Sequence, residues 1–333
     1  MGTAMPHHSP RYRLLLPAVL LFLATFNPAA VAAEVAFDQW LIALRAEALG
    51  KGISADTVHT ALNDVRPIPR VIELDRRQPE FTMTFEQYIE RVVPATRIQL
   101  GQQKLRENEA LLREIGALFG VQPRFIVALW GIETNFGQNT GGFAVIPALA
   151  TLAHDGRRSA FFRKELLHAL TIIDQGHIAA ADMTGSWAGA MGQNQFMPSS
   201  FLSYAVDHDR DGRQNIWTSR ADIFASMANY LRGVGWRGDE TWGRQVILPA
   251  GFNPDLTGLE VEKRLSEWQA LGVRRADGGD LPARDLMASI VLPDGPGGRA
   301  YAAYNNYRSI LKWNRSTYFA TAVGHLSDAI AVR

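Results

Sequence analysis

Residues 125–130 form an unbroken apolar stretch, Phe-Ile-Val-Ala-Leu-Trp, and Pro123 stands just before it. Proline suits the first turn of a helix, so the sequence predicts that a helix begins there. A helix that is apolar on every face must be buried on all sides. The remaining chain therefore has to enclose this segment, and the acidic residue Glu133 follows it closely.

The pattern of the other residues indicates a mainly α protein of the α+β kind. Apolar residues recur at helical spacing in residues 35–120, 148–153, 160–173, 223–231 and 316–330. Prolines interrupt this pattern around residues 68–85, which predicts a segment that wraps over a surface. Short β-type runs at residues 246–248, 289–292 and 299–304 predict a small sheet, with a Pro- and Gly-rich hairpin turn before the last run.

The first 33 residues have the composition of a cleavable export signal. They contain no acid, they begin with a basic stretch that includes Arg11 and Arg13, and residues 14–26 are apolar. This apolar run is shorter than the ~20 residues that a membrane-spanning helix needs. Small residues end the segment, so we expect cleavage near Ala33 and export to the periplasm.

Charge and cysteine content exclude several kinds of protein. Cleavage after Ala33 removes two arginines and no acids, so the formal net charge of +1 becomes −1. A nearly neutral protein lacks the basic face expected of a nucleic-acid binder. The chain has no cysteine, which excludes disulfides, thiolate nucleophiles and the acylated cysteine of a lipoprotein. We therefore expect a soluble periplasmic protein without a stable membrane span.

Glu133 is the first candidate for chemistry. Burial at the end of an apolar helix makes its charged form costly and raises its pKa. Glycoside cleavage needs an acid that stays protonated near neutral pH, because the bridging oxygen must receive a proton as its bond breaks. The alternative is a helix-end glutamate that merely reaches solvent, and position alone does not decide between the two.

A second candidate is the segment 185–199, in which small residues alternate with polar and aromatic ones. Glycine and alanine let a sugar ring approach the backbone closely. Ser186 and Gln195 can bond to hydroxyl or acetamido groups, while Trp187 or Phe196 offers a stacking face. A Gly-rich turn between two helices would explain the glycines, but not the clustered Gln, Met and Pro.

These segments together resemble the B-type lytic murein transglycosylases, a lysozyme-like family. Five blocks carry the resemblance, at residues 73–81, 128–137, 185–199, 228–230 and 306–314. It implies a lysozyme-like catalytic core with a surrounding helical domain and a small β insertion. The expected organisation is a signal peptide (1–33), an N-terminal helical region (34–118), the core (119–237), the β insertion (238–304) and a C-terminal helical segment (305–333).

The resemblance also implies the site and its reaction. Glu133 would be the single acid/base, and the residues expected to line the groove are Tyr88, Ser186, Gln195, Phe196, Tyr230, Tyr307 and Trp313. Trp313 stands where some relatives carry tyrosine, so we expect stacking only. Asp155, Glu165 and Asp174, the acids nearest in sequence to Glu133, are expected on solvated surfaces.

The implied reaction cleaves the bond between MurNAc and GlcNAc with one glutamate instead of the usual two carboxylates. Glu133 would protonate the bridging oxygen and then accept the proton of the MurNAc 6-hydroxyl, which closes a 1,6-anhydro ring. The rival hypotheses are a hydrolytic muramidase and a non-catalytic peptidoglycan-binding or scaffold protein. Peptidoglycan glycan strands are the expected partner, and other cell-wall enzymes are further candidates.

Residues 207–218 resemble the start of a calcium loop. Acids occupy the first, third and fifth places and a glycine the sixth, but the twelfth place, usually glutamate, is Thr218. The candidate metal residues are Asp207, Asp209, Asp211, Arg213 and Asp222, and the resemblance suggests that Asp222 closes the site. Such a Ca²⁺ site would be structural, because catalysis requires no cofactor. A polar turn with helix-capping aspartates is the alternative.

Overall fold

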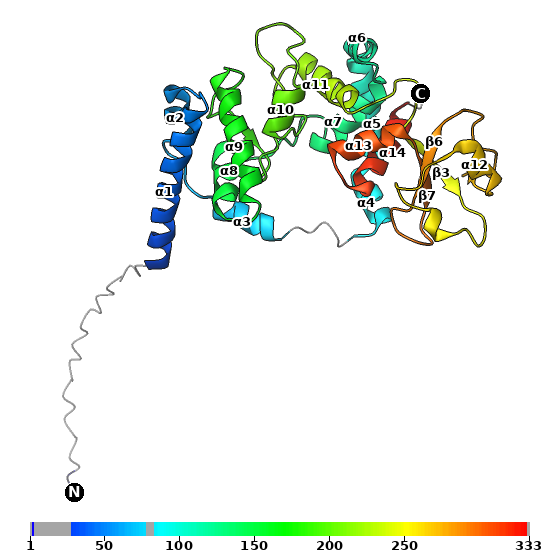
Figure 1. Cartoon of the computed structure of the whole chain (residues 1–333), viewed down its shortest axis with the longest axis horizontal. Coiled ribbons are helices and arrows are strands. Elements are labelled where there is room, and N and C mark those ends of the chain that lie inside the picture. The colour runs from blue at the N-terminus through cyan, green and yellow to red at the C-terminus, as the bar shows by residue number, and fades with distance from the viewer. Residues whose placement is uncertain (1, 3–27, 78–82, 332–333) are drawn as a thin grey trace.

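The computed structural model describes residue 2, residues 28–77 and residues 83–331 (Figure 1). Most of the expected export signal lies outside these residues, and helix α1 (Pro28–Gly50) begins within its last part. No single helix of the described residues is long and apolar enough to cross a membrane. Helices α6 (Glu109–Phe119) and α7 (Pro123–Thr134) meet that test only as a pair, across a bend of 109°.

Helix α7 is the apolar segment that the sequence predicted. It has Pro123 in its first turn, and its residues from Phe125 to Gly131 are all buried. The helices that pack against it are α5 (Ala95–Glu107), α6, α11 (Arg220–Gly233) and α14 (Thr317–Ala331). Together with α4 (Phe85–Val92) and α13 (Asn305–Trp313), they form the first hydrophobic cluster. The prediction of an enclosed helix is confirmed.

The second hydrophobic cluster lies at the other end of the helical part (Figure 1). It joins α1 with α2 (Ala55–Leu62), α3 (Pro69–Arg76), α8 (Val145–His154), α9 (Ser159–Asp174) and α10 (Pro198–Tyr204). Helix α3 corrects the expectation of a non-helical segment there. Pro69 stands at the start of the helix, where a backbone N–H is not needed, so it begins the helix instead of breaking it.

The predicted small sheet is five-stranded and antiparallel, in the order β4-β6-β7-β3-β5. Its strands are β3 (Gly243–Ile247), β4 (Lys263–Arg264), β5 (Arg274–Arg275), β6 (Met287–Val291) and β7 (Ala300–Ala303). The expected hairpin is the β6–β7 pair, with Ser289 opposite Ala303. Helix α12 (Leu265–Ala270) covers a third hydrophobic cluster with Trp268 at its centre.

A second sheet, not expected from the sequence, has only two short strands, β1 (Phe143–Ala144) and β2 (Thr184–Gly185). It ties the segment after α7 to the start of the 185–199 segment. In Figure 1, α13 and α14 (red) lie between the five-stranded sheet on one side and helices α1–α3 and α8–α10 on the other. Trp313, the last residue of α13, packs against both the first and the second cluster. The end of α13 therefore contacts both clusters.

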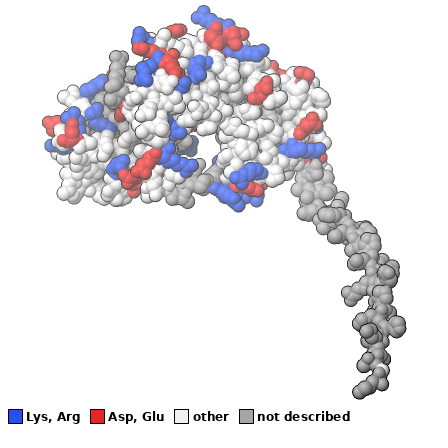
Figure 2. All heavy atoms as spheres, turned by 180° about the vertical axis from the view of Figure 1, so that it is seen from behind, with Lys and Arg blue, Asp and Glu red and all other residues white. Residues whose placement is uncertain are grey.

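Charged residues on the face seen in Figure 2 occur in small groups of mixed sign, separated by uncharged surface. Lysines and arginines lie beside aspartates and glutamates in most of these groups. This distribution agrees with the near-zero net charge. That face has no basic stripe of the kind that follows a nucleic-acid backbone.

Candidate active site

Glu133 lies one residue before the end of α7, where the chain turns sharply. Asn135 and Phe136 both have left-handed backbone conformations, with φ of 50° and 59°. The Thr134 hydroxyl donates to the Gln193 carbonyl at 3.1 Å, and the Trp130 Nε1–H donates to Gln193 Oε1 at 2.9 Å. These bonds hold the end of the helix against the 185–199 segment, so the structure brings the two sequence candidates together.

Two opposing effects act on the pKa of Glu133. Burial raises it, and a hydrogen bond from Trp313 lowers it; burial is the larger effect, so the pKa is raised to about 7. The side chain keeps partial contact with solvent, but the dense packing around it outweighs that contact. Near neutral pH the group is therefore a partly protonated acid that a ligand can reach, as general acid/base chemistry needs.

Trp313 contacts Glu133 directly. Its indole Nε1–H donates to Glu133 Oε1 at 2.7 Å. The expectation that Trp313 only stacks is therefore wrong, because its ring nitrogen donates a hydrogen bond to the acid. The aromatic type at this position was visible in the sequence, but the direction of the N–H was not.

Phe196 and Tyr230 support this indole. Their ring centroids lie 5.2 and 4.7 Å from that of Trp313, and they are only 3% and 8% exposed. The Tyr230 hydroxyl donates to the Lys312 carbonyl at 2.7 Å, which fixes the last turn of α13. The expectation that both residues line the groove is corrected, because both are buried in the second cluster.

Tyr307 does not line a groove either. It is fully buried in the first cluster, and its hydroxyl lies 3.1 Å from the Thr317 carbonyl and 3.0 Å from Thr321 Oγ1. Burial raises its pKa to about 12. The role expected for Tyr307 as a wall residue is corrected to a core position that joins α13 to α14.

Tyr88 lies beside Glu133. It is partly exposed on α4, and its pKa is raised to about 12, first by burial and second by the charge of Glu133. Arg97 on α5 opposes that shift, and its Nε–H donates to Asn135 Oδ1 at 3.4 Å. Sequence reasoning missed Arg97, because nothing in its local pattern distinguishes it from a surface arginine on a helix.

Ser186 and Gln195 are held in the turns of the 185–199 segment, and both are partly exposed. Ser186 Oγ accepts the N–H of Ala190 at 3.0 Å. Gln195 Nε2 donates to the carbonyls of Thr140 and Gly192, each at 3.0 Å. Among the described residues, the Ser186 hydroxyl proton and Gln195 Oε1 have no protein partner, so both remain available to a ligand.

No second carboxylate influences Glu133 within the described residues, since only burial and Trp313 act on its pKa. Asp155 pairs with Arg76 at 3.0 Å, and Asp174 accepts the Ser54 N–H at 3.1 Å. Glu165 is only 2% exposed and accepts the Ser199 N–H at 2.9 Å, at the start of α10. Its expected place on a solvated surface is corrected, because a buried helix terminus takes this carboxylate.

The acidic loop has the form of a cation site. Oxygens of Asp207, Asp209 and Asp211 lie within 4.8 Å of one another, and Gly212 takes the positive φ of the sharp turn at 90°. Asp222 lies outside this group and is fully buried. Its oxygens accept the backbone N–H groups of His208 and Asn215, both at 2.7 Å. Asp222 therefore stabilises the backbone conformation of the loop.

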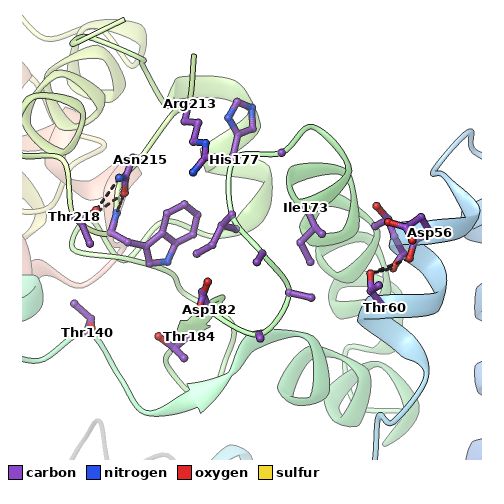
Figure 3. Close-up of a pocket in the computed structure, with 17 residues that line it drawn as sticks. Asp56, Thr60, Thr140, Ile173, His177, Asp182, Thr184, Arg213, Asn215 and Thr218 are labelled. Atoms are coloured by element: carbon purple, nitrogen blue, oxygen red, sulfur yellow. Dashed lines mark hydrogen bonds between the residues drawn. The ribbon is translucent and has the colours of Figure 1, made fainter. Parts of the chain in front are cut away.

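A cavity of about 960 Å³ opens elsewhere, between α2, the segment after α9 and the end of the acidic loop (Figure 3). Arg213 and His177 lie at one end of it, and Thr140 and Thr184 at the other. Glu133, Tyr88 and Trp313 do not line this space. It is separate from the acid, although Thr140 connects it to Gln195 through the hydrogen bond described above.

Comparisons with known proteins identify the family of this chain. The sequence model of the family described as "Transglycosylase SLT domain" matches residues 36–328. The chain is similar to the membrane-bound lytic murein transglycosylase B of Escherichia coli (strain K12), with 32% identity over 248 residues that cover 74% of this chain and 67% of that protein.

Solved structures are similar as well. SltB3 from Pseudomonas aeruginosa, in complex with NAG-anhNAM-pentapeptide, shares 45% identity at a TM-score of 0.86, over 88% of this chain and 79% of that one. The Escherichia coli lytic transglycosylase Slt35, in complex with calcium, shares 28% identity at a TM-score of 0.76, over 87% and 92%. The mainly helical fold with its small sheet is thus the lysozyme-like fold. The chain belongs to the lytic murein transglycosylases that carry the transglycosylase SLT domain.

Proposed function

We propose that this enzyme cleaves the β-1,4 bond between MurNAc and GlcNAc in peptidoglycan and leaves a 1,6-anhydroMurNAc end. The supporting observation is Glu133, whose pKa is raised to about 7 while no other described carboxylate acts on it. A lone acid of this kind suits a reaction in which the substrate supplies its own nucleophile. The complex of SltB3 with an anhydro sugar supports the same product.

In the first step, protonated Glu133 gives its proton to the bridging oxygen. The bond from that oxygen to C1 of MurNAc breaks, and GlcNAc leaves with a new hydroxyl. In the second step, the Glu133 carboxylate accepts the proton of the MurNAc 6-hydroxyl while that oxygen bonds to C1. No water is consumed, and Glu133 ends protonated. A pKa near 7 suits both steps, because it makes neither protonation state costly.

We assign the substrate contacts around the scissile glycosidic bond to the partly exposed polar groups near Glu133. The Ser186 hydroxyl and Gln195 Oε1 are free to bond to sugar substituents, and Tyr88 flanks the acid from α4. Trp313 contributes its N–H to Glu133 and its outer face to the ligand. Tyr230 and Phe196 pack against the Trp313 ring and hold it in place.

The product decides between this reaction and its rivals. Purified sacculi are digested with the native enzyme, and the released muropeptides are analysed by mass spectrometry. We expect anhydroMurNAc ends; reducing MurNAc ends without the anhydro form would identify a hydrolytic muramidase. Glu133→Gln should bind sacculi without releasing muropeptides, whereas unchanged release would remove Glu133 from its role. A native enzyme that binds and releases nothing would be a scaffold protein.

We also propose that the acidic loop binds Ca²⁺ through Asp207, Asp209 and Asp211, with Asp222 shaping the loop. The support is their mutual distance, the glycine turn and the calcium complex of Slt35. The melting temperature should rise by about 2–4 °C with Ca²⁺, as expected for about 1 kcal/mol of binding. Mg²⁺ serves as the control ion. Asp209→Ala combined with Asp211→Ala should abolish the rise, and no response in the native protein would restore the polar-turn hypothesis.

We propose that the enzyme acts in the periplasm after loss of residues 1–33. The basic start, the apolar run and the small residues before Glu34 support this. N-terminal sequencing of protein from a periplasmic extract should begin at or near Glu34. An intact N-terminus in a membrane fraction would contradict the proposal.

A further inference from the structure

The hydrogen bond between Trp313 and Glu133 is directional. An indole N–H is a donor only, and here it points at Oε1 from 2.7 Å. A proton on Oε1 along that line would face the N–H proton of the ring. Because a carbonyl oxygen accepts an N–H better than a protonated oxygen does, this bond favours the acid proton on the other carboxyl oxygen, Oε2.

The indole is also held against swinging away. Phe196 and Tyr230 pack against its ring, and Tyr204 packs against Tyr230 with centroids 4.6 Å apart. The residue before it is fixed at both ends: the Lys312 carbonyl accepts the Tyr230 hydroxyl at 2.7 Å, and Lys312 Nζ donates to the Val234 carbonyl at 3.0 Å. A donor placed by this many contacts has a defined direction.

We propose that Trp313 is a positioning residue that confines the exchangeable proton of Glu133 to Oε2. One oxygen then performs both steps: Oε2 gives its proton to the bridging oxygen, and the same Oε2 takes the proton of the MurNAc 6-hydroxyl. This inference rests on the proposed transglycosylase reaction. It predicts that the leaving oxygen and the 6-hydroxyl reach the same side of the carboxyl group in turn.

The same bond strengthens when Glu133 ionises, because a charged acceptor holds an N–H more tightly than a neutral one. Trp313 thus stabilises the carboxylate that remains after the first proton transfer. Removing the N–H has two separate effects: the acid loses its orientation, and it becomes weaker. The first effect lowers the maximal rate, while the second extends the protonated form to higher pH.

The test compares Trp313→Phe, which lacks the donor, with Trp313→Tyr, which restores one, and with Trp40→Phe. Trp40 lies on α1 in the second cluster, so its variant makes the same chemical change far along the chain from Glu133. kcat and KM are measured on soluble glycan fragments as a function of pH. In parallel, carbon-13 NMR follows the titration of the Glu133 carboxyl in the free enzyme.

For Trp313→Phe we expect kcat at low pH to fall about 10-fold and the alkaline limb of kcat/KM to move up by about one pH unit, as a bond to a charged group implies. KM should change little. The NMR titration of Glu133 should move in the same direction as the limb. Trp313→Tyr should recover part of both effects, and Trp40→Phe should behave like the native enzyme.

A lower rate with an unmoved limb and an unmoved NMR titration would reduce Trp313 to a packing residue and overturn the inference. So would a Trp313→Phe enzyme with the native rate. Thermal melting of each variant identifies any loss of rate that comes from unfolding, and in that case the NMR titration at low temperature decides. If the native enzyme makes no anhydro product, the proposed function fails, but the titration of Glu133 still tests the bond.

Discussion

Asp75 on α3 and Glu133 on α7 are both carboxylic acids set against hydrophobic clusters, but their neighbours differ. Asp75 is 1% exposed and accepts hydrogen bonds from Arg157 Nε at 2.7 Å and from Arg158 at 2.6 Å. These arginines lower its pKa against the effect of burial. Glu133 has a neutral indole as its donor, so burial prevails and its pKa is raised to about 7.

The difference shows that the placement of cations decides what a buried acid does. Asp75 joins α3 to the loop between α8 and α9, and its lowered pKa keeps the carboxylate charged to lower pH than an ordinary aspartate. Arg97 opposes the rise in the pKa of Tyr88, but it does not act on the pKa of Glu133. Because no cation lowers the pKa of Glu133, the acid keeps its proton to higher pH than Asp75 does.

The largest expected effect is the loss of activity in Glu133→Gln. General acid/base catalysis contributes about 10²–10⁴-fold, and here one residue acts in both steps, so sacculus clearing should slow by on the order of 10³-fold or more. Turbidity of a sacculus suspension measures this. Asp75→Asn is the matched control, because it removes the other buried charge and should keep its activity per folded molecule. Equal losses of activity in both variants would contradict a catalytic role that Glu133 has and Asp75 lacks.

Stability should respond to pH in opposite directions at the two sites. Because the folded pKa of Glu133 is raised from 4.5 to about 7, its contribution is complete below pH 4.5 and is lost as the pH rises through 7. The loss is about 3 kcal/mol, since one pKa unit corresponds to about 1.4 kcal/mol. Urea unfolding between pH 4.5 and 8 should show the native protein weakening relative to Glu133→Gln. Parallel curves would place the Glu133 pKa at its ordinary value.

Asp75→Asn should destabilise the protein by about 2 kcal/mol at neutral pH, less than for a fully buried ion pair because both arginines are half exposed. The folded pKa of Asp75 is lowered, so its contribution is present above the ordinary Asp value and is lost as the pH falls through the lowered one. The difference between native and variant should therefore shrink in acid. Urea unfolding at pH 7 and at pH 3 checks this, and a difference independent of pH would argue for packing alone.

The smallest effect is expected from Arg158→Ala, at about 1 kcal/mol or less, because Arg157 still pairs with Asp75 and the lost side chain is half exposed. Thermal melting with Arg163→Ala as a comparison measures it, since Arg163 pairs with Glu47 away from Asp75. A loss as large as that of Asp75→Asn would mean that one arginine alone holds this acid.

The sequence predicted the buried helix α7 and the place of Glu133 near its end, because burial leaves a strong local pattern in residues 125–130. It also predicted the β6–β7 hairpin from its turn. It missed what depends on contacts between distant segments: the Trp313 donor 180 residues beyond Glu133, the inward direction of Tyr307 and the burial of Glu165. The sequence shows that a residue is aromatic, but the direction in which its ring points depends on the helices and strands that pack around it. The two-residue strands β1 and β2 are too short to leave any pattern.

The packing of α14 on α7 has a consequence for synthesis, in which a chain is made from its N-terminus onward. A ribosome finishes α7 and Glu133 long before it reaches α13, which carries the Trp313 donor, and α14, which packs on α7. A chain released before residue 305 has the acid without its donor, and it leaves an apolar helix face exposed. The acid that we propose as catalytic therefore gains its hydrogen-bond donor only after synthesis has passed residue 313.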